Sequence, residues 1–190
     1  GIPLQSAYCG AKHGIQGFFD SLRSELIHEK INIDISMVHL PALNTTQFQF
    51  VKSRLPNKPR PMGTIFQPEV AARAIVFAAT TPRRGMLVGL PTLQSVWGNK
   101  FIPGLLDHYL AKIGYEGQQT QEPADPNQPH NLWEPIPGDH GAHGRFDNQS
   151  KQKSVQLWAA KNRDRIGWAT AGSLVLGLAV LAWGRFFNNH

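Results

Sequence analysis

The sequence predicts an α/β protein that holds the C-terminal half of a doubly wound parallel sheet, followed by a Pro- and Gly-rich linker and a single C-terminal transmembrane helix. Helix and strand patterns alternate over residues 1–114, as they do where helices join parallel strands. Polar residues and prolines dominate residues 115–160, with little hydrophobic periodicity. Residues 161–190 carry a long uncharged run flanked by basic residues. These three ranges are the domains that the sequence predicts.

The first elements are a helix over residues 7–30 and a strand over residues 31–40. Apolar residues recur at spacings of three to five in the helix, with charges between them. In the strand they first alternate and then become continuous, which is typical of a strand buried in a parallel sheet. Pro41 should end the strand, because proline cannot donate to a ladder.

The next elements complete an α/β pattern. Residues 44–55 could form a short amphipathic helix, and an irregular loop with three prolines follows. Pro68 stands where a helix start favours proline, and an apolar stripe continues from it to near Pro82. Residues 85–89 read as a short strand, and residues 98–114 as a last helix packed on the sheet.

Composition excludes several classes of function. The net charge is +6, but the basic residues are scattered and not interleaved with aromatics, so we expect no nucleic-acid partner. Cys9 is the only cysteine, which rules out an internal disulfide and a zinc site built on cysteines. We therefore expect a reducing compartment. Residues 1–7 lack the basic start and apolar run of a signal peptide, and the missing initial Met suggests a fragment.

The uncharged run from Ile166 to Trp183 predicts the membrane anchor. Its 18 residues just span a hydrocarbon core of about 30 Å. Three basic residues precede it closely and one follows, so we expect the catalytic domain to face the cytoplasm. Ala169, Ser173 and Gly177 form a small-residue stripe on which two such helices could pack into a homo-oligomer. The alternative is a helix buried in the globular domain.

The residues that carry chemistry stand at the start of the first helix. Tyr8 and Lys12 are four residues apart, so they share one face of a helix. A Lys cation beside a phenol stabilises the phenolate, and such a pair can act as general acid or base for a carbonyl/alcohol couple. The spacing alone is a weak signal; its context adds Gly10 and Ala11 inside the motif, then a buried strand and the sequence Pro-Ala-Leu-Asn-Thr-Thr from Pro41.

This succession resembles the short-chain dehydrogenase/reductase family over residues 1 to about 112. The resemblance implies a Rossmann-like fold, with Tyr8 as catalytic acid/base and Lys12 as the residue that holds the cofactor ribose and tunes Tyr8. In the family a Pro-Gly motif and a Thr after the strand contact the nicotinamide. Here Ala42 replaces the Gly, and Thr45 or Thr46 could be the Thr. The implied cofactor site, for NAD or NADP, comprises Tyr8, Lys12, Pro41, Ala42, Leu43, Thr45 and Thr46.

Two features of the family are not found in the chain. No Gly-rich turn for the pyrophosphate precedes Tyr8, and Ser6 stands too close to Tyr8 to match the family's catalytic Ser. The chain therefore resembles only the C-terminal portion of the family, and we expect it to be inactive by itself. The choice between NAD and NADP, the substrate and the oligomeric state stay open.

Two further groups of residues suggest functions beside that site. Phe48, Phe50, Val51 and Leu55 lie where the family builds its substrate lid, and an apolar lid would suit a hydrophobic substrate; packing of a short helix is the alternative. Asp139, His140 and His143 invite a metal site, but a Gly-rich loop fixes ligands poorly, so we expect no metal there.

The leading function is hydride transfer between a nicotinamide cofactor and an alcohol or carbonyl substrate, an oxidoreductase activity of the full-length chain. The alternative is a noncatalytic, membrane-tethered interaction module, which would need neither Tyr8 nor Lys12. An upstream Gly-rich turn, with a Ser about a dozen residues before Tyr8, would decide for the enzyme.

Overall fold

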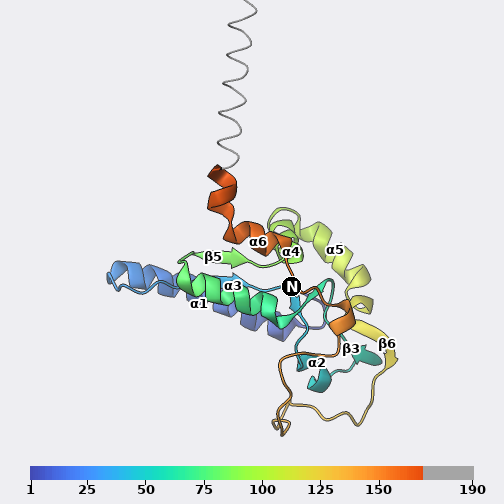
Figure 1. Ribbon diagram of the computed structural model, residues 1–190. Helices are drawn as coiled ribbons and strands as arrows, with labels where there is room; N and C mark the ends of the chain where they lie inside the picture. The colour runs from blue at the N-terminus through green and yellow to red at the C-terminus, as the bar shows by residue number, and fades with distance from the viewer. Residues whose placement is uncertain (169–190) are drawn as a thin grey trace, which may run out of the picture. The chain divides into compact units, whose positions relative to one another are not determined.

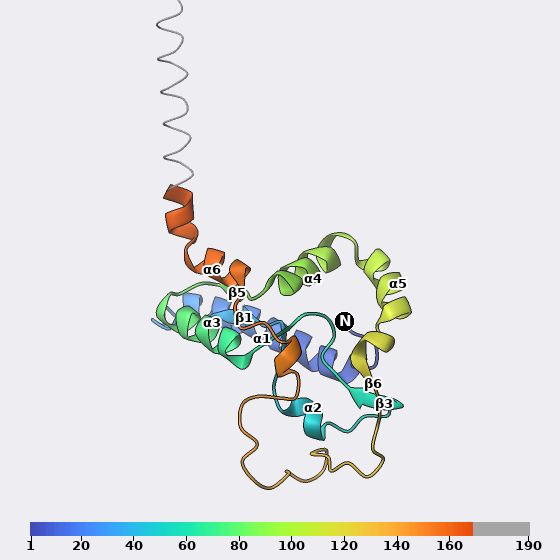
Figure 2. The same ribbon diagram turned by 45° about the vertical axis from the view of Figure 1, so that its right-hand side comes forward.

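The computed structural model describes residues 1–168. Residues 1–154 form one compact unit, and a second unit begins at Val155 with helix α6 (Val155–Lys161). All the site residues that the sequence predicts, from Tyr8 to Leu55, lie in the first unit, whose helices and strands are drawn in Figures 1 and 2.

A parallel strand pair and a helix form the centre of the first unit. Strand β1 (Met37–His39) pairs with β5 (Gly85–Leu87), with Val38 opposite Met86. Helix α3 (Pro68–Thr80) contacts β1, and its buried stripe is Val70, Ala71, Ala74 and Ala78. Helices α1 (Ser6–His28) and α3 both run beside the strand pair in Figures 1 and 2. The predictions of a first helix and of a helix from Pro68 are confirmed.

Two further strand pairs hold the segments between these elements. Strand β2 (Ala42–Leu43) runs parallel to β4 (Ile65–Phe66), and Lys151 forms a parallel bridge with Phe66. Strand β3 (Asn57–Pro59) runs antiparallel to β6 (Gln119–Pro123). Ile65 and Phe66 are 1% and 4% exposed, so β4 belongs to the core.

The remaining elements are short helices. Helix α2 (Gln47–Phe50) occupies only part of the predicted helix over residues 44–55. In place of one helix over residues 98–114 there are two, α4 (Leu90–Phe101) and α5 (Pro103–Ile113). They break at Pro103, which has no N–H and whose ring would clash with the preceding turn. Two 3₁₀ turns, Glu116–Gln118 and Asp147–Gln149, complete the unit.

The prediction of half of a doubly wound parallel sheet is wrong. The described residues form three separate two-stranded pairs, with strands of two to five residues, and one pair is antiparallel. Residues 31–36, predicted as strand, have no strand partner among the described residues, and Ile33 is 60% exposed. An extended segment becomes a strand only where a neighbour takes its hydrogen bonds, so β1 begins at Met37, opposite Gly85.

The prediction of a transmembrane helix, and with it of a membrane-anchored protein whose catalytic domain faces the cytoplasm, is also overturned. No helix within residues 1–168 is long and apolar enough to cross a bilayer. The longest, α1, has 23 residues but carries the charges of Lys12, Asp20, Arg23 and Glu25. Only Ile166–Trp168 of the predicted span are described; the rest, with the small-residue stripe for a homo-oligomer, lies outside the described residues.

The polar segment after α5 is part of the first unit. Strand β6 holds its beginning, and residues 143–151, which we call the strap, hold its end through backbone bonds. Lys151 N donates to Ile65 O at 2.9 Å, and Gln67 N donates to Lys151 O at 3.0 Å. Between β6 and the strap the chain passes beside α2 (Figure 2).

Candidate functional site

Tyr8 and Lys12 lie in the first two turns of α1, on one face. The Lys12 ammonium stands 5.4 Å from the centroid of the Tyr8 ring. Tyr8 is 52% exposed, and Lys12 is exposed and has no carboxylate partner among the described residues. At this distance the ammonium and the face of the ring form a cation–π contact. The phenol and the ammonium are therefore both accessible to a ligand and adjacent to each other.

The loop from Pro41 to Thr46 leaves the carboxyl end of β1. In parallel sheets this end is where ligands bind. Ala42, which replaces the Gly expected from the family resemblance, belongs to β2 and pairs with Ile65, as does Leu43 with Phe66. Such extended backbone suits any residue, so the replacement causes no strain there. Thr45 and Thr46 are half-buried, and neither hydroxyl bonds to another described residue.

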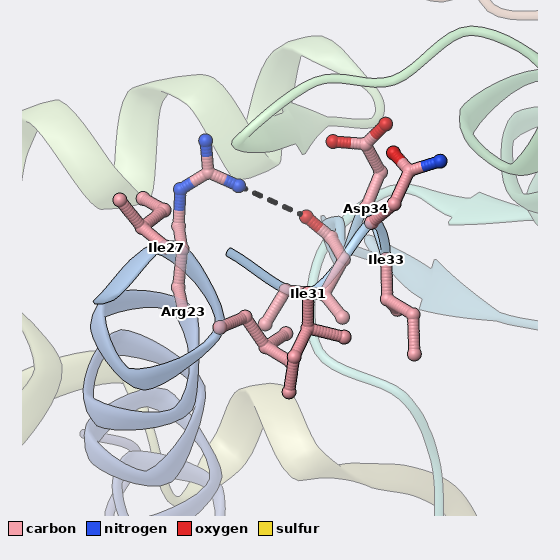
Figure 3. A pocket seen from close by; sticks show the side chains of 8 residues that line it. Arg23, Ile27, Ile31, Ile33 and Asp34 are labelled. Carbon is pink, nitrogen blue, oxygen red and sulfur yellow. Dashed lines mark hydrogen bonds between the residues drawn. The ribbon is translucent and has the colours of Figure 1, made fainter. Parts of the chain in front are cut away.

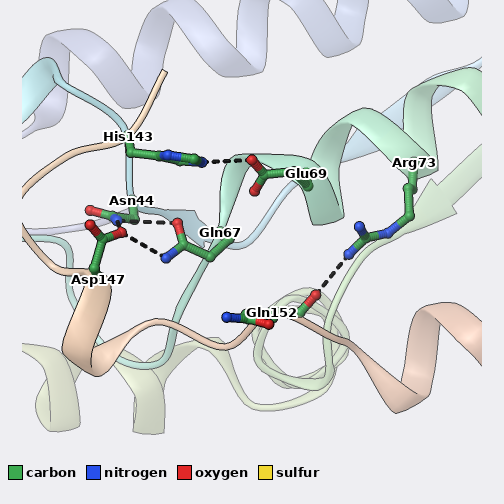
Figure 4. A network of polar contacts seen from close by, with 7 residues as sticks. All are labelled: Asn44, Gln67, Glu69, Arg73, His143, Asp147 and Gln152. Atoms are coloured by element: carbon green, nitrogen blue, oxygen red, sulfur yellow. Dashed lines mark hydrogen bonds and ion pairs between the residues drawn. The ribbon is translucent and has the colours of Figure 1, made fainter. Parts of the chain in front are cut away.

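Asn44 connects this loop to the strap and is completely buried (Figure 4). Its amide nitrogen donates to Asp147 Oδ1 at 2.8 Å and to Gln67 Oε1 at 3.2 Å. Its side-chain oxygen accepts from Phe146 N at 3.0 Å. Gln67 Nε2 also donates to Asp147 Oδ1, at 2.8 Å, which closes a ring of three side chains.

Close backbone contact accompanies the side-chain network. Gly144 N donates to Asn44 O at 3.0 Å, and Asn44 N donates to Phe66 O at 2.8 Å. A Cβ on Gly144 would overlap the carbonyl oxygen of Thr45 and lie 2.8 Å from Asn44 Oδ1. Only glycine lets the strap approach the loop this closely.

A contact between a histidine and a carboxylate ties the start of the strap to the start of α3. His143 Nε2 lies 2.6 Å from Glu69 Oε1 (Figure 4). Hydrogen bonding by the Glu69 backbone N–H, in the first turn of α3, and then by His143 lowers the pKa of the Glu69 carboxyl from 4.5. Farther along α3, Arg73 donates to Gln152 O at 2.7 Å, just beyond the strap.

The predicted lid residues lie against the polar segment after β6. Phe48 meets Phe146 edge to face, with ring centroids 6.1 Å apart, and the Phe50 and His140 rings are 4.7 Å apart. Asn131 N donates to Phe50 O at 3.0 Å. Val51 and Leu55 are half-buried in the chain that follows α2. Phe48 and Phe50 thus have packing partners in this structure.

The histidines that suggested a metal site have other partners. His140 Nε2 lies 3.2 Å from Ile136 O, and His143 pairs with Glu69. Within residues 1–168 no three His, Cys, Asp or Glu side chains gather closely enough to hold a metal ion.

A small hollow lies at the far end of α1, lined by Arg23, Leu26, Ile27 and residues 31–35 (Figure 3). Arg23 closes one side by donating to Ile35 O at 3.5 Å. Arg23 is 15 residues from Tyr8, or about 22 Å along a helix. This hollow is therefore separate from the Tyr8 and Lys12 site.

The predicted site residues fall into two groups. Tyr8 and Lys12 contact each other, and Pro41, Ala42, Leu43, Thr45 and Thr46 form one loop, but no hydrogen bond or ion pair joins these groups within the described chain. Sequence reasoning missed Asn44, Gln67, Gly144 and Asp147 as a connected set. No local pattern marks them, because the bond between Asn44 and Asp147 spans 103 positions.

Comparison with known proteins gives two similarities. The chain is 28% identical over 184 residues to a Bacillus subtilis (strain 168) protein named uncharacterized oxidoreductase YxnA; the match covers 96% of the chain and 49% of that protein. A stretch of 38 residues is 47% identical to dehydrogenase/reductase SDR family member 7C of Xenopus tropicalis, covering 20% of the chain and 12% of the frog protein.

The chain spans about half the length of the Bacillus relative. No protein-family model matches the chain, and no solved structure matches it. Both relatives are named for oxidation or reduction chemistry, and the frog protein is named as a member of the SDR family, to which the sequence motifs at Tyr8 and Pro41 also point by resemblance.

Proposed function

We propose that the protein is a nicotinamide-dependent oxidoreductase that interconverts an alcohol and a carbonyl compound, with Tyr8 as acid/base and Lys12 as its electrostatic partner. The observation that carries this proposal is the Lys12 ammonium 5.4 Å from the Tyr8 ring, with both side chains open to a ligand. The similarity to named oxidoreductases supports it.

In this proposal the protein moves a proton at the phenol oxygen of Tyr8. Tyr8 donates its proton to the carbonyl oxygen during reduction and accepts one from the alcohol during oxidation. Lys12 lowers the cost of the phenolate that forms, because its positive charge lies beside the ring and has no carboxylate partner within residues 1–168. Lys12 also has free N–H donors for the hydroxyls of a cofactor ribose.

The proposed cofactor is NAD or NADP, which when bound supplies or accepts the hydride. The loop residues fit its nicotinamide end: they follow the carboxyl end of a parallel strand, and the Thr45 and Thr46 hydroxyls have no bond to the rest of the described chain. Gly89, just after β5, has φ +83°, and a Cβ there would press on Phe66 and Pro41 at 3.3–3.4 Å. This glycine keeps the strand ends close together.

The substrate class follows from the residues beyond the loop. Phe48 and Phe50 lie on α2, immediately after the proposed cofactor loop, and their half-buried rings pack against Phe146 and His140. We propose that they form one wall of a pocket for a hydrophobic alcohol or carbonyl compound.

Substitution of Tyr8 by Phe in the full-length protein tests the proposal. Only the exchangeable proton is removed, so turnover of a responsive carbonyl substrate with NADH or NADPH should fall by about 10²- to 10⁴-fold. Tyr109→Phe is the matched control, because Tyr109 is a similarly exposed tyrosine on α5, at 56%. Retention of near-wild-type turnover by Tyr8→Phe at saturating cofactor would overturn the assignment.

A further inference from the structure

We propose that Asn44 and Asp147 are positioning residues through which the strap holds the loop from Pro41 to Thr46 in the shape that binds the nicotinamide cofactor. The inference rests on the proposed function and adds to it a role for a segment more than 100 positions away along the chain.

The chemistry of its partners fixes the orientation of the Asn44 amide. Phe146 N is an obligate donor and meets the side-chain oxygen, whereas the Asp147 carboxylate is an acceptor and meets the nitrogen. A flipped amide would place donor against donor and acceptor against acceptor. Because Asn44 is completely buried, water cannot replace either partner.

Backbone bonds hold the same residue from two sides. Asn44 N donates to Phe66 O of β4, and Asn44 O accepts from Gly144 N of the strap. The strap is itself hydrogen-bonded through Lys151, whose N–H donates to Ile65 O of β4 and whose carbonyl oxygen accepts from Gln67 N. The loop is therefore clamped between a core strand and the strap, and Thr45 and Thr46 follow directly from the clamped residue.

Asp147 serves this clamp through its Oδ1 atom as an acceptor. That atom accepts from both Asn44 and Gln67, at 2.8 Å each, and the carboxylate has no cationic partner within residues 1–168. An asparagine at this position offers the same oxygen without the charge. Asp147→Asn therefore separates a need for the acceptor from a need for the negative charge.

The experiment compares Asp147→Ala with Asp147→Asn in the full-length protein. Cofactor dissociation constants are measured by nicotinamide fluorescence, and KM for cofactor and kcat are measured with a responsive carbonyl substrate. Hydrogen exchange of the Gly144 and Phe146 amides reports whether the strap stays docked. Asp125→Ala is the control, because Asp125 lies in the same polar segment but, within residues 1–168, its side chain accepts only from Asn127 N, two residues on.

Asp147→Ala should weaken cofactor binding and raise its KM by about tenfold or more, as expected for the loss of two bonds to a charged acceptor, and should speed exchange at both amides. Its kcat at saturating cofactor should stay within about twofold of wild type, because Tyr8 and Lys12 are not linked to the strap. Asp147→Asn should stay close to wild type. If Asp147→Ala does not fold, Asp147→Ser takes its place, because its oxygen is one bond short of the Oδ1 position.

Two outcomes overturn the inference in different ways. Wild-type cofactor affinity in Asp147→Ala, with faster exchange at Gly144 and Phe146, would show that the strap does not position the loop and would leave the proposed function intact. A wild-type protein that binds neither NADH nor NADPH would refute the proposed function itself, and this inference with it.

Discussion

Gly144→Ala is expected to loosen the strap without removing any hydrogen-bonding group. The new Cβ would overlap the Thr45 carbonyl oxygen and lie 2.8 Å from Asn44 Oδ1, where nonbonded carbon and oxygen require more than 3.0 Å. The strap must move outward, which lengthens the bonds from Gly144 N to Asn44 O and from Phe146 N to Asn44 Oδ1, both 3.0 Å. Overpacking typically costs about 1–3 kcal/mol. Near the middle of that range, about 2 kcal/mol, the open population of the strap rises roughly thirtyfold.

Native-state hydrogen exchange measures this opening directly. The amides at positions 144 and 146 should lose about thirtyfold in protection, while those of α3 keep theirs. Gly104→Ala provides the control, because a Cβ there meets nothing within 4 Å and its φ is not in the left-handed region. Wild-type protection at both strap amides in Gly144→Ala would refute the reasoning from close approach.

The remaining predictions concern α3. Because the pKa of Glu69 is lower in the folded state, the stability that its contacts contribute is present above its unfolded value near 4.5 and is lost as pH falls through the lower folded value. The melting temperatures of wild type and Glu69→Gln should therefore converge as the pH is lowered below 4.5, and a constant difference down to strongly acidic pH would contradict this. Val70→Ala should cost about 2 kcal/mol in urea unfolding, because Val70 is 0% exposed. Val76→Ala on the same helix should change the free energy of unfolding by less than about 0.5 kcal/mol, because Val76 is 64% exposed. Equal losses of unfolding free energy in the two variants would show that burial does not determine the loss.

The helices show where sequence patterns were sufficient. The apolar spacing of α1 and the Pro68 start of α3 are local signals, and both helices lie within two residues of the predicted positions. Pro103 is also a local signal for a helix break, since proline is disfavoured in helix interiors. The apolar pattern on both sides of Pro103 instead predicted one continuous helix.

Strand length could not be predicted in the same way. Residues 31–36 have the alternating pattern of a strand, yet a strand also needs a neighbour, and pairing is a property of distant segments. The contacts of the candidate site show the same difference between local and distant segments. Tyr8 and Lys12 meet because of a four-residue spacing within one helix, whereas Asn44 meets Asp147 across 103 positions. Composition indicated a solvated linker over the strap, because Phe146 is the one large apolar residue in it, and that ring is buried and packs on Phe48.

That long separation sets an order for the assembly of the molecule. Closing a loop of about 100 residues is entropically costly, so the contact between Asn44 and Asp147 should form after the local helices and after β4. During synthesis the Asn44 side chain can therefore bond to Phe146 and Asp147 only after the strap has left the ribosome. A chain that stopped short of Gly144 would retain Tyr8, Lys12 and both threonines but would offer the Asn44 side-chain oxygen no Phe146 N–H.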